Sequence, residues 1–316
     1  MEQISSSLLR RLFVAVSAAG LTLAAAPAFA GVELLLQDRD VARSVSLGGS
    51  CNRCELSGRN LTGATFTGAT FISATLVGSD LRGAELVGSN FTGSDFTRAN
   101  LRGVEILGAN FAEADFSNAS LAGAEAQGSS FVRSNLSRAD LSGAELHGVN
   151  FNGATLAGAN LSDSELFGAT LANVKAAGAN FANAQVNASN LASGDFTGAS
   201  FRNAQLTAAR LSGGRFDRAD FSDAEMRRTD IRGVDLSGAR GLTQAQVSLA
   251  CGDSSTRLPG RLTAQSCRGA ARVIRTVDRL IIHSVMRPGT IRINRLRSQP
   301  PTDFLSPDLI NCADLS

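Results

Sequence analysis

A large apolar residue recurs at every fifth position over more than half of this 316-residue chain. Within residues 66–91 the series consists of Phe66, Phe71, Leu76, Leu81, Leu86 and Phe91. An α-helix repeats every 3.6 residues and a β-strand every two, so neither keeps a five-residue series on one side. The pattern therefore excludes a fold built mainly of amphipathic helices or alternating strands.

The series continues without a slip from Leu56 to Leu236, which makes 37 consecutive repeats. The central residue is Leu, Phe, Ile, Val or Met except at Ala126 and Ala176, where we expect local repacking rather than a bend or a small cavity. A small residue lies two positions before the centre in all but the first two repeats, and 21 of the 37 residues two positions after it are Gly. Gly and Asn tolerate the backbone angles of tight corners. A chain that turns the same way every five residues is a solenoid.

A second spacing, of twenty residues, gives the number of sides. Phe recurs at central positions 71, 91, 111, 131 and 151, and again at 181, 201 and 221. Glu or Gln recurs one position before the centre at 85, 105, 125, 145, 165, 185, 205 and 225. Twenty residues are four repeats, so each coil has four sides and residues twenty apart stack in columns. At about 4.8 Å per coil, the repeats predict about nine coils and a rod on the order of 45 Å long.

The repeats resemble the pentapeptide-repeat family, whose motif is A-(D/N)-L-x-x. The motif occurs here as Ala99-Asn100-Leu101, Ala109-Asn110-Phe111, Ala139-Asp140-Leu141 and Ala159-Asn160-Leu161. The resemblance covers about 185 residues and its register never breaks. It implies an all-β fold, a right-handed quadrilateral β-helix, whereas the residues alone predict four sides but not the handedness.

We expect five segments along the chain: a cleaved signal peptide at 1–30, an N-terminal cap at 31–54, the solenoid at 55–240, a C-terminal cap at 241–267 and a basic tail at 268–316. Residues 40–46 predict a short helix in the first cap. Thr243 and Gln246 form a Thr-x-x-Gln capping box, which predicts a helix in the second. The tail predicts a small α/β or partly disordered segment, with an amphipathic helix at 270–286 and a strand at 290–296.

The first thirty residues have the pattern of an export signal. Arg10 and Arg11 precede an apolar stretch that is too short for a membrane anchor, and Ala28-Phe29-Ala30 is an A-x-A cleavage site. Cleavage between Ala30 and Gly31 predicts a periplasmic or secreted protein. General secretion is favoured over the twin-arginine route, because the residues that usually flank the arginine pair are missing.

The cysteines fit an oxidising compartment, although five of them leave at least one thiol without an internal partner. Cys51 and Cys54 are interpreted as a structural disulfide. A redox site would need a βαβ setting, zinc would need two further ligands, and haem attachment would need His where Glu55 stands. The resemblance to exported pentapeptide-repeat proteins implies a second disulfide between Cys251 and Cys267. The connection of Cys312 stays open.

Catalysis has few candidates, because the chain has two His, one Lys and neither Trp nor Tyr. No nucleophile triad, phosphate loop or metal-ligand cluster appears, so we expect no enzyme activity, no cofactor and no metal. His147 is expected on the surface, and His283 is expected to be packed in the tail. The near-neutral charge of +2 does not favour nucleic-acid binding.

One face is a candidate binding surface. A column of Glu is expected beside a column of mainly apolar residues, and the two columns comprise Glu85, Glu105, Glu125, Glu145, Glu165, Val87, Leu107, His147 and Phe167. Acids beside exposed apolar residues favour a contact with a partner. Stacked carboxylates can also simply stay solvated, or attract a basic partner such as the Arg-rich tail of this chain.

The sequence thus predicts a non-enzymatic exported solenoid that acts as a rigid scaffold for an unknown protein partner. The alternative is a structural rod held to the cell envelope by the tail, since residues 241–316 carry ten Arg and five acids and can contact a membrane surface. Open solenoid ends also favour an end-to-end homodimer. The family includes DNA mimics that protect gyrase, but residues 51–240 are only weakly acidic, with 19 acids and 16 bases, and an exported protein would not meet gyrase.

Overall fold

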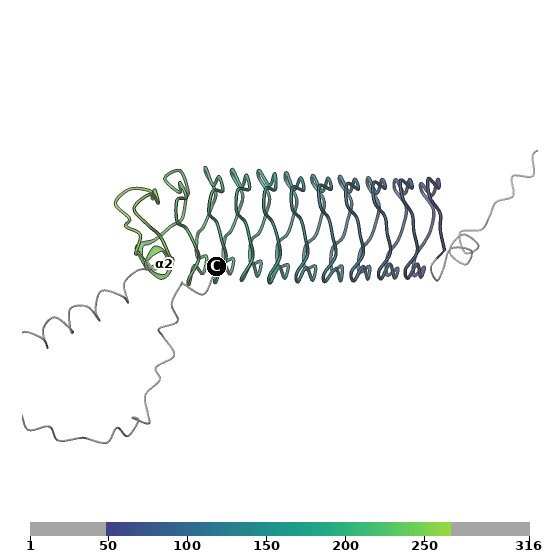
Figure 1. The fold of residues 1–316 in the computed structure, drawn as a ribbon, viewed down its shortest axis with the longest axis horizontal. Coiled ribbons are helices and arrows are strands. Elements are labelled where there is room, and N and C mark those ends of the chain that lie inside the picture. Colours follow the sequence, from purple (N-terminus) through teal and green to yellow (C-terminus); the bar gives the residue numbers. More distant parts are fainter. Residues whose placement is uncertain (1–48, 267–316) are drawn as a thin grey trace, which may run out of the picture. The chain divides into compact units, whose positions relative to one another are not determined.

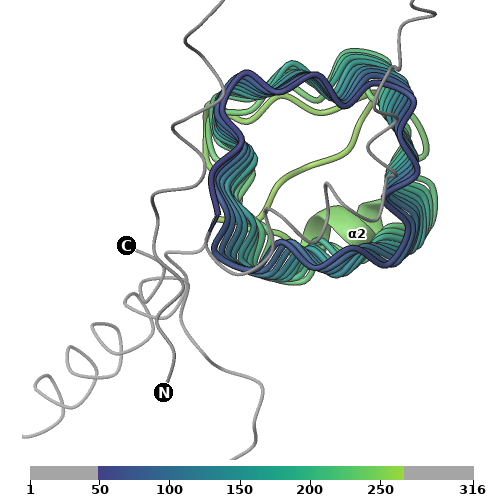
Figure 2. The ribbon, with the colours of Figure 1, turned by 90° about the vertical axis from the view of Figure 1, so that its right-hand side faces the viewer.

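The structure is a computed structural model that describes residues 49–266. The predicted signal peptide, the helix expected at residues 40–46, Cys267, Cys312 and the tail lie outside the described residues. The described chain forms a coil with four sides (Figures 1 and 2). Each repeat contributes one bridge residue that pairs in parallel with the residue twenty positions on, from Ser50 with Thr70 to Asp220 with Arg240. The prediction of a four-sided solenoid is confirmed.

Backbone hydrogen bonds explain why the five-residue step is stable. The N–H of the central Leu101 donates to the carbonyl of Ser120 in the next coil at 2.7 Å. Gly103, two positions later, donates to Ala122 at 3.0 Å. The turn between them is closed by the N–H of Val104, which donates to the carbonyl of Leu101 at 3.2 Å. The ladder and the turn thus pair most backbone polar groups of a repeat, as a buried shaft requires.

The corner residue, two positions after the centre, has positive φ in every repeat from residue 53 to residue 233. Twenty of these 37 corners are Gly and 17 are other residues. Gly and Asn were the expected corner residues, but Arg98, Glu113 and Ala208 also adopt φ between 58° and 62°. This conformation costs an L-residue about 1–2 kcal/mol. The stacked coils therefore impose the corner geometry even where the side chain disfavours it.

The shaft is filled by the central residues. The Phe column at 71, 91, 111, 131 and 151 stacks with ring centroids 4.6–5.5 Å apart and planes within 23°. A second column places Phe181, Phe201 and Phe221 in the same way. The ladder passes without a break through the small residues Ala126 and Ala176, whose N–H groups donate to the next coil at 2.9 and 2.7 Å.

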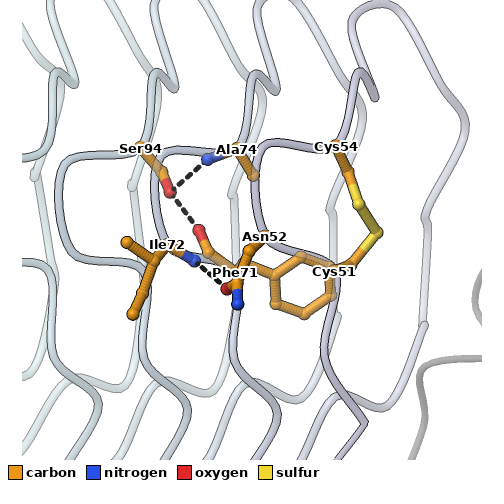
Figure 3. Close-up of a disulfide and its surroundings, with 7 residues drawn as sticks. All are labelled: Cys51, Asn52, Cys54, Phe71, Ile72, Ala74 and Ser94. Atoms are coloured by element: carbon orange, nitrogen blue, oxygen red, sulfur yellow. Dashed lines mark hydrogen bonds between the residues drawn. A yellow bond between two sulfur atoms is a disulfide. The ribbon is translucent and has the colours of Figure 1, made fainter.

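The coil begins at Ser50, five residues before the expected boundary at residue 55. Cys51 already occupies a central position, with its N–H donating to Thr70, and Cys54 occupies the small position before Leu56. A disulfide joins the two cysteines, whose Cα atoms lie 5.4 Å apart, beside the ring of Phe71 (Figure 3). Because both cysteines face inward, they belong to the first coil rather than to a cap preceding it.

Helix α2, Gln244–Leu249, lies at the C-terminal end of the shaft, over one corner of the coil (Figures 1 and 2). It begins at the predicted capping box, in which the side chains of Thr243 and Gln246 each accept a hydrogen bond from the other's backbone N–H. Val247 is buried, and the Gln246 side chain donates to the carbonyls of Phe221 and Ala224 at 2.8 and 3.0 Å. The helix thus satisfies the Ala224 carbonyl, whereas the Phe221 carbonyl also accepts the N–H of Ala224 within its own turn.

The chain after α2 rejoins the ladder. Asp230 pairs with Cys251 and Asp235 with Arg257, so the step lengthens from 20 residues to 21 and 22. Cys251 is disulfide-bonded, and its predicted partner Cys267 lies outside the described residues. The added residues accommodate the helix without ending the parallel pairing.

The surroundings of Gly194 show how tightly the shaft is packed. A Cβ at this position would lie 2.5 Å from a ring carbon of Phe196 and 3.1 Å from a methyl of Val174. The ring cannot retreat, because it stacks on Phe216 at 5.2 Å. We expect Gly194→Ala to lower the free energy of unfolding by about 1–3 kcal/mol in urea titrations. The control is Gly238→Ala, whose added Cβ would meet nothing closer than 3.5 Å and which should leave stability unchanged; equal losses in both variants would contradict this account.

Candidate protein-interaction face

The predicted Glu column lies on one side of the coil. Glu85, Glu105, Glu125, Glu145 and Glu165 follow one another through parallel bridges, and Gln185, Gln205 and Glu225 continue the column. The residues two positions further along form a second column, linked by backbone bonds such as that from Gly88 to Leu107 and from Gly148 to Phe167. We call the two columns from Glu85 to Phe167, including Gln127, the Glu face. The structure therefore brings together all nine residues that the sequence predicted for this surface.

The acidic and amide residues of the other three sides have a local structural role. The carboxylate of Asp95 accepts the backbone N–H of Thr97 at 2.8 Å, and that of Asp115 accepts Ser117 at 2.7 Å. Asn110 accepts Ala112 in the same way at 3.1 Å. These bonds satisfy an N–H inside the turn, as Asp and Asn commonly do. Folding alone therefore explains the Asp and Asn residues that stand on these sides.

The Glu column does not serve this purpose. Glu55, on another side, shows that a Glu can accept the turn N–H, since its carboxylate accepts Ser57 at 2.9 Å. None of the five carboxylates from Glu85 to Glu165 accepts such a bond among the described residues. The turns of this side form without them, so the local fold does not explain why five acids stand in a row.

Contacts divide the Glu face into two halves. In its C-terminal half, Gln127 donates to Glu145 at 2.5 Å and the Nε2 atom of His147 lies 3.0 Å from a carboxylate oxygen of Glu165. Each of these pairs joins one coil to the next. In the N-terminal half the corresponding residues are apolar and cannot donate. Within the described part of the chain, the side chains of Glu105 and Glu125 consequently make no hydrogen bond or ion pair.

An exposed aromatic residue completes the surface. Phe167 is 58% exposed, more than any other large apolar residue in the described coils and cap. Val87 and Leu107 are half-buried. The repeats that build this side carry no Lys or Arg from residue 64 to residue 208. Apolar area beside uncompensated acids is typical of a contact surface.

Charge is also separated along the rod, a feature the sequence analysis missed. Residues 49–199 carry 13 acidic and 8 basic side chains, whereas residues 200–266 carry 7 acidic side chains and 10 Arg. The first set is net −5 and the second net +3. Counting charges segment by segment along the predicted coil axis could have shown it.

Neither a metal site nor a membrane-spanning helix is found among the described residues. Residues 49–266 contain no group of three or more His, Cys, Asp or Glu side chains that could hold a metal ion. In the same part of the chain, no helix is long and apolar enough to span a bilayer. His147 lies on the open surface beside Glu165, as expected, whereas His283 lies outside the described residues.

The side chain of Glu125 should not stabilise the fold. Glu125 stacks between Glu105 and Glu145, and like charges at about 4.8 Å repel by roughly 1 kcal/mol in water. We expect Glu125→Gln to raise the free energy of unfolding by up to about 1 kcal/mol at low salt, with the gain vanishing at high salt. The contrast is Asp115→Ala, which removes a turn acceptor and should cost about 1 kcal/mol. Urea titrations at two salt concentrations measure both, and a clear loss in Glu125→Gln would show that the column is structural.

Known proteins with the same repeats place the chain in a family. The family model described as pentapeptide repeats (8 copies) matches residues 50–86, 76–106, 108–138, 134–171, 164–203 and 199–238. No curated protein sequence matches significantly.

Solved structures with the same repeats include HetL, a pentapeptide repeat protein involved in heterocyst differentiation regulation in the cyanobacterium Nostoc sp. strain PCC 7120. It is 26% identical, with a TM-score of 0.57 over 72% of this chain and 97% of HetL. QnrB1, a plasmid-mediated fluoroquinolone resistance protein, is 19% identical, with a TM-score of 0.31 over 76% and 99%. A pentapeptide repeat protein of the Arabidopsis thaliana thylakoid lumen is 33% identical, with a TM-score of 0.21 over 32% and 67%. The chain belongs to the pentapeptide-repeat family, and its coils form the right-handed quadrilateral β-helix of that family.

Proposed function

We propose that this protein is an exported, non-enzymatic scaffold that binds a protein partner through the Glu face. The observation that carries the proposal is a row of five acids that the turns do not use, ending beside the exposed ring of Phe167. The partner that fits such a surface has basic side chains at intervals of about 5 Å, matching the spacing of the coils, together with an apolar group for the aromatic ring.

Two effects would stabilise the complex with the partner. Arg or Lys of the partner would relieve the mutual repulsion of the carboxylates, most of all at Glu105 and Glu125, which lack partners within the described chain. The apolar side chains Val87, Leu107 and Phe167 would lose water at the same time. Aromatic residues often supply much of the binding energy at interfaces, so Phe167 is the expected anchor and the acids provide orientation and rate of association.

Export is part of the proposal. It is supported by the pattern of residues 10–30 and by the disulfide between Cys51 and Cys54, since disulfides persist in oxidising compartments. The alternative of an envelope rod depends on residues 268–316, which lie outside the described part. A DNA-like role is poorly supported, because the described residues carry 20 acidic and 18 basic side chains.

A photo-activated cross-linker at residue 167 tests the proposal. We expect the full chain, expressed with its export signal in its own cells, to capture a defined protein partner when the cross-linker replaces Phe167. The matched control places it at Ala177, which is exposed on the opposite side of the coil. Changing the five Glu of the column to Gln should reduce capture at least tenfold. Capture that is equal at both positions, or unaffected by the Gln changes, would contradict a role for this face.

A further inference from the structure

We propose that the Glu face also has a ligand within the same chain: the arginine-rich segment of residues 268–297, which docks on the face and must be displaced by a partner. The inference rests on the proposed function, because it names an occupant of the same surface. Eight Arg and one Asp make this segment net +7, whereas the repeats of the Glu face carry five Glu and no Lys or Arg from residue 64 to residue 208.

The charge gradient of the coils favours this docking. The described chain ends at Ser266, which pairs with Gly252 in the C-terminal cap. Residues 200–266 around that point are net +3, so they repel a basic segment that starts there. The coils that carry the Glu face belong to the part that is net −5. The segment is therefore repelled by residues 200–266, where it begins, and attracted by residues 49–199, further along the same rod.

The segment is long enough to reach the face. Seven coils separate Glu225 from Glu85, which corresponds to about 34 Å at the usual strand spacing. The helix expected at 270–286 would span about 25 Å, and the other thirteen residues about 40 Å when extended. Together they can cover the whole Glu face from the C-terminal end.

The spacing of the segment also fits. Arg272, Arg275 and Arg279 follow one another at three and four residues, which gives about 4.5 and 6 Å along the helix that their apolar neighbours predict. The Glu column repeats at about 4.8 Å. On the same predicted helix Val273, Ile274, Val277 and Ile281 lie on the side away from these arginines, so the arginines can face the Glu column without them. The spacing of the arginines along the helix is therefore close to that of the Glu column.

Limited trypsin digestion of the full mature chain tests the docking, because trypsin cleaves after Arg. We expect cleavage after Arg272, Arg275 and Arg279 to be at least tenfold slower in the parent than in a variant with all five Glu of the column changed to Gln. The matched control removes five acids from other sides of the solenoid. It changes Asp80, Asp95, Asp115, Asp140 and Asp195 to Asn.

Asn keeps the turn acceptor and already stands in the same columns at Asn100 and Asn135, so this control should fold and retain protection. Equal cleavage rates in the parent and the Gln variant would overturn the inference. Protection that depends on protein concentration would assign the contact to a second copy, and protection seen only with anionic vesicles would assign it to lipid; each result overturns docking within one chain.

The cross-linker at residue 167 separates this inference from the proposed function. In purified mature chain we expect mass spectrometry to find a link between residue 167 and residues 268–297. If no such link forms but residue 167 still captures another protein in cells, the face binds a partner and the inference about the segment fails alone. If neither link forms, both fail.

Discussion

The parallel ladder between successive coils is the constraint on which the rest of this structure depends. Each central residue donates to the coil above, as Leu101 does to Ser120, and the turn closes on itself through bonds such as that from Val104 to Leu101. Every coil must therefore repeat the same twenty-residue path. A side chain placed once on a given side recurs in a column, and the columns hold Phe in the shaft and Glu on the surface.

The ladder explains why so much could be predicted from the sequence. A fold whose bridge residues pair twenty positions apart shows its register as a spacing, so the four sides, the Phe columns and the Glu column were visible. The capping box of α2 was visible as a local motif. The start at Ser50 was missed because Cys51 and Cys54 do not look like a central and a small residue, although they occupy those places. The disulfide lets two cysteines stand where Leu and Ala are usual.

The details of the corners and of the Glu face were beyond the sequence for a different reason. Arg98 and Ala208 take positive φ because stacked neighbours force it, and no local propensity predicts that outcome. The two halves of the face likewise differ in whether a side chain in one coil can contact the Glu of the next coil. Gln127 reaches Glu145 and His147 reaches Glu165, whereas Leu107 cannot pair with Glu125. Such contacts depend on side-chain length and direction, which spacing alone does not give.

A solenoid also offers a criterion for separating structural from functional acids. Asp95 and Asp115 bind turn N–H groups, so their presence follows from folding. The Glu residues of the neighbouring side are one methylene longer and do not accept the turn N–H groups. They also repel one another along the column. Glu105 and Glu125, which make no hydrogen bond or ion pair within the described coils, favour a cause outside the coil. A basic ligand held at the spacing of the coils provides that cause, and the exposed ring of Phe167 at the end of the row indicates where its apolar part would lie.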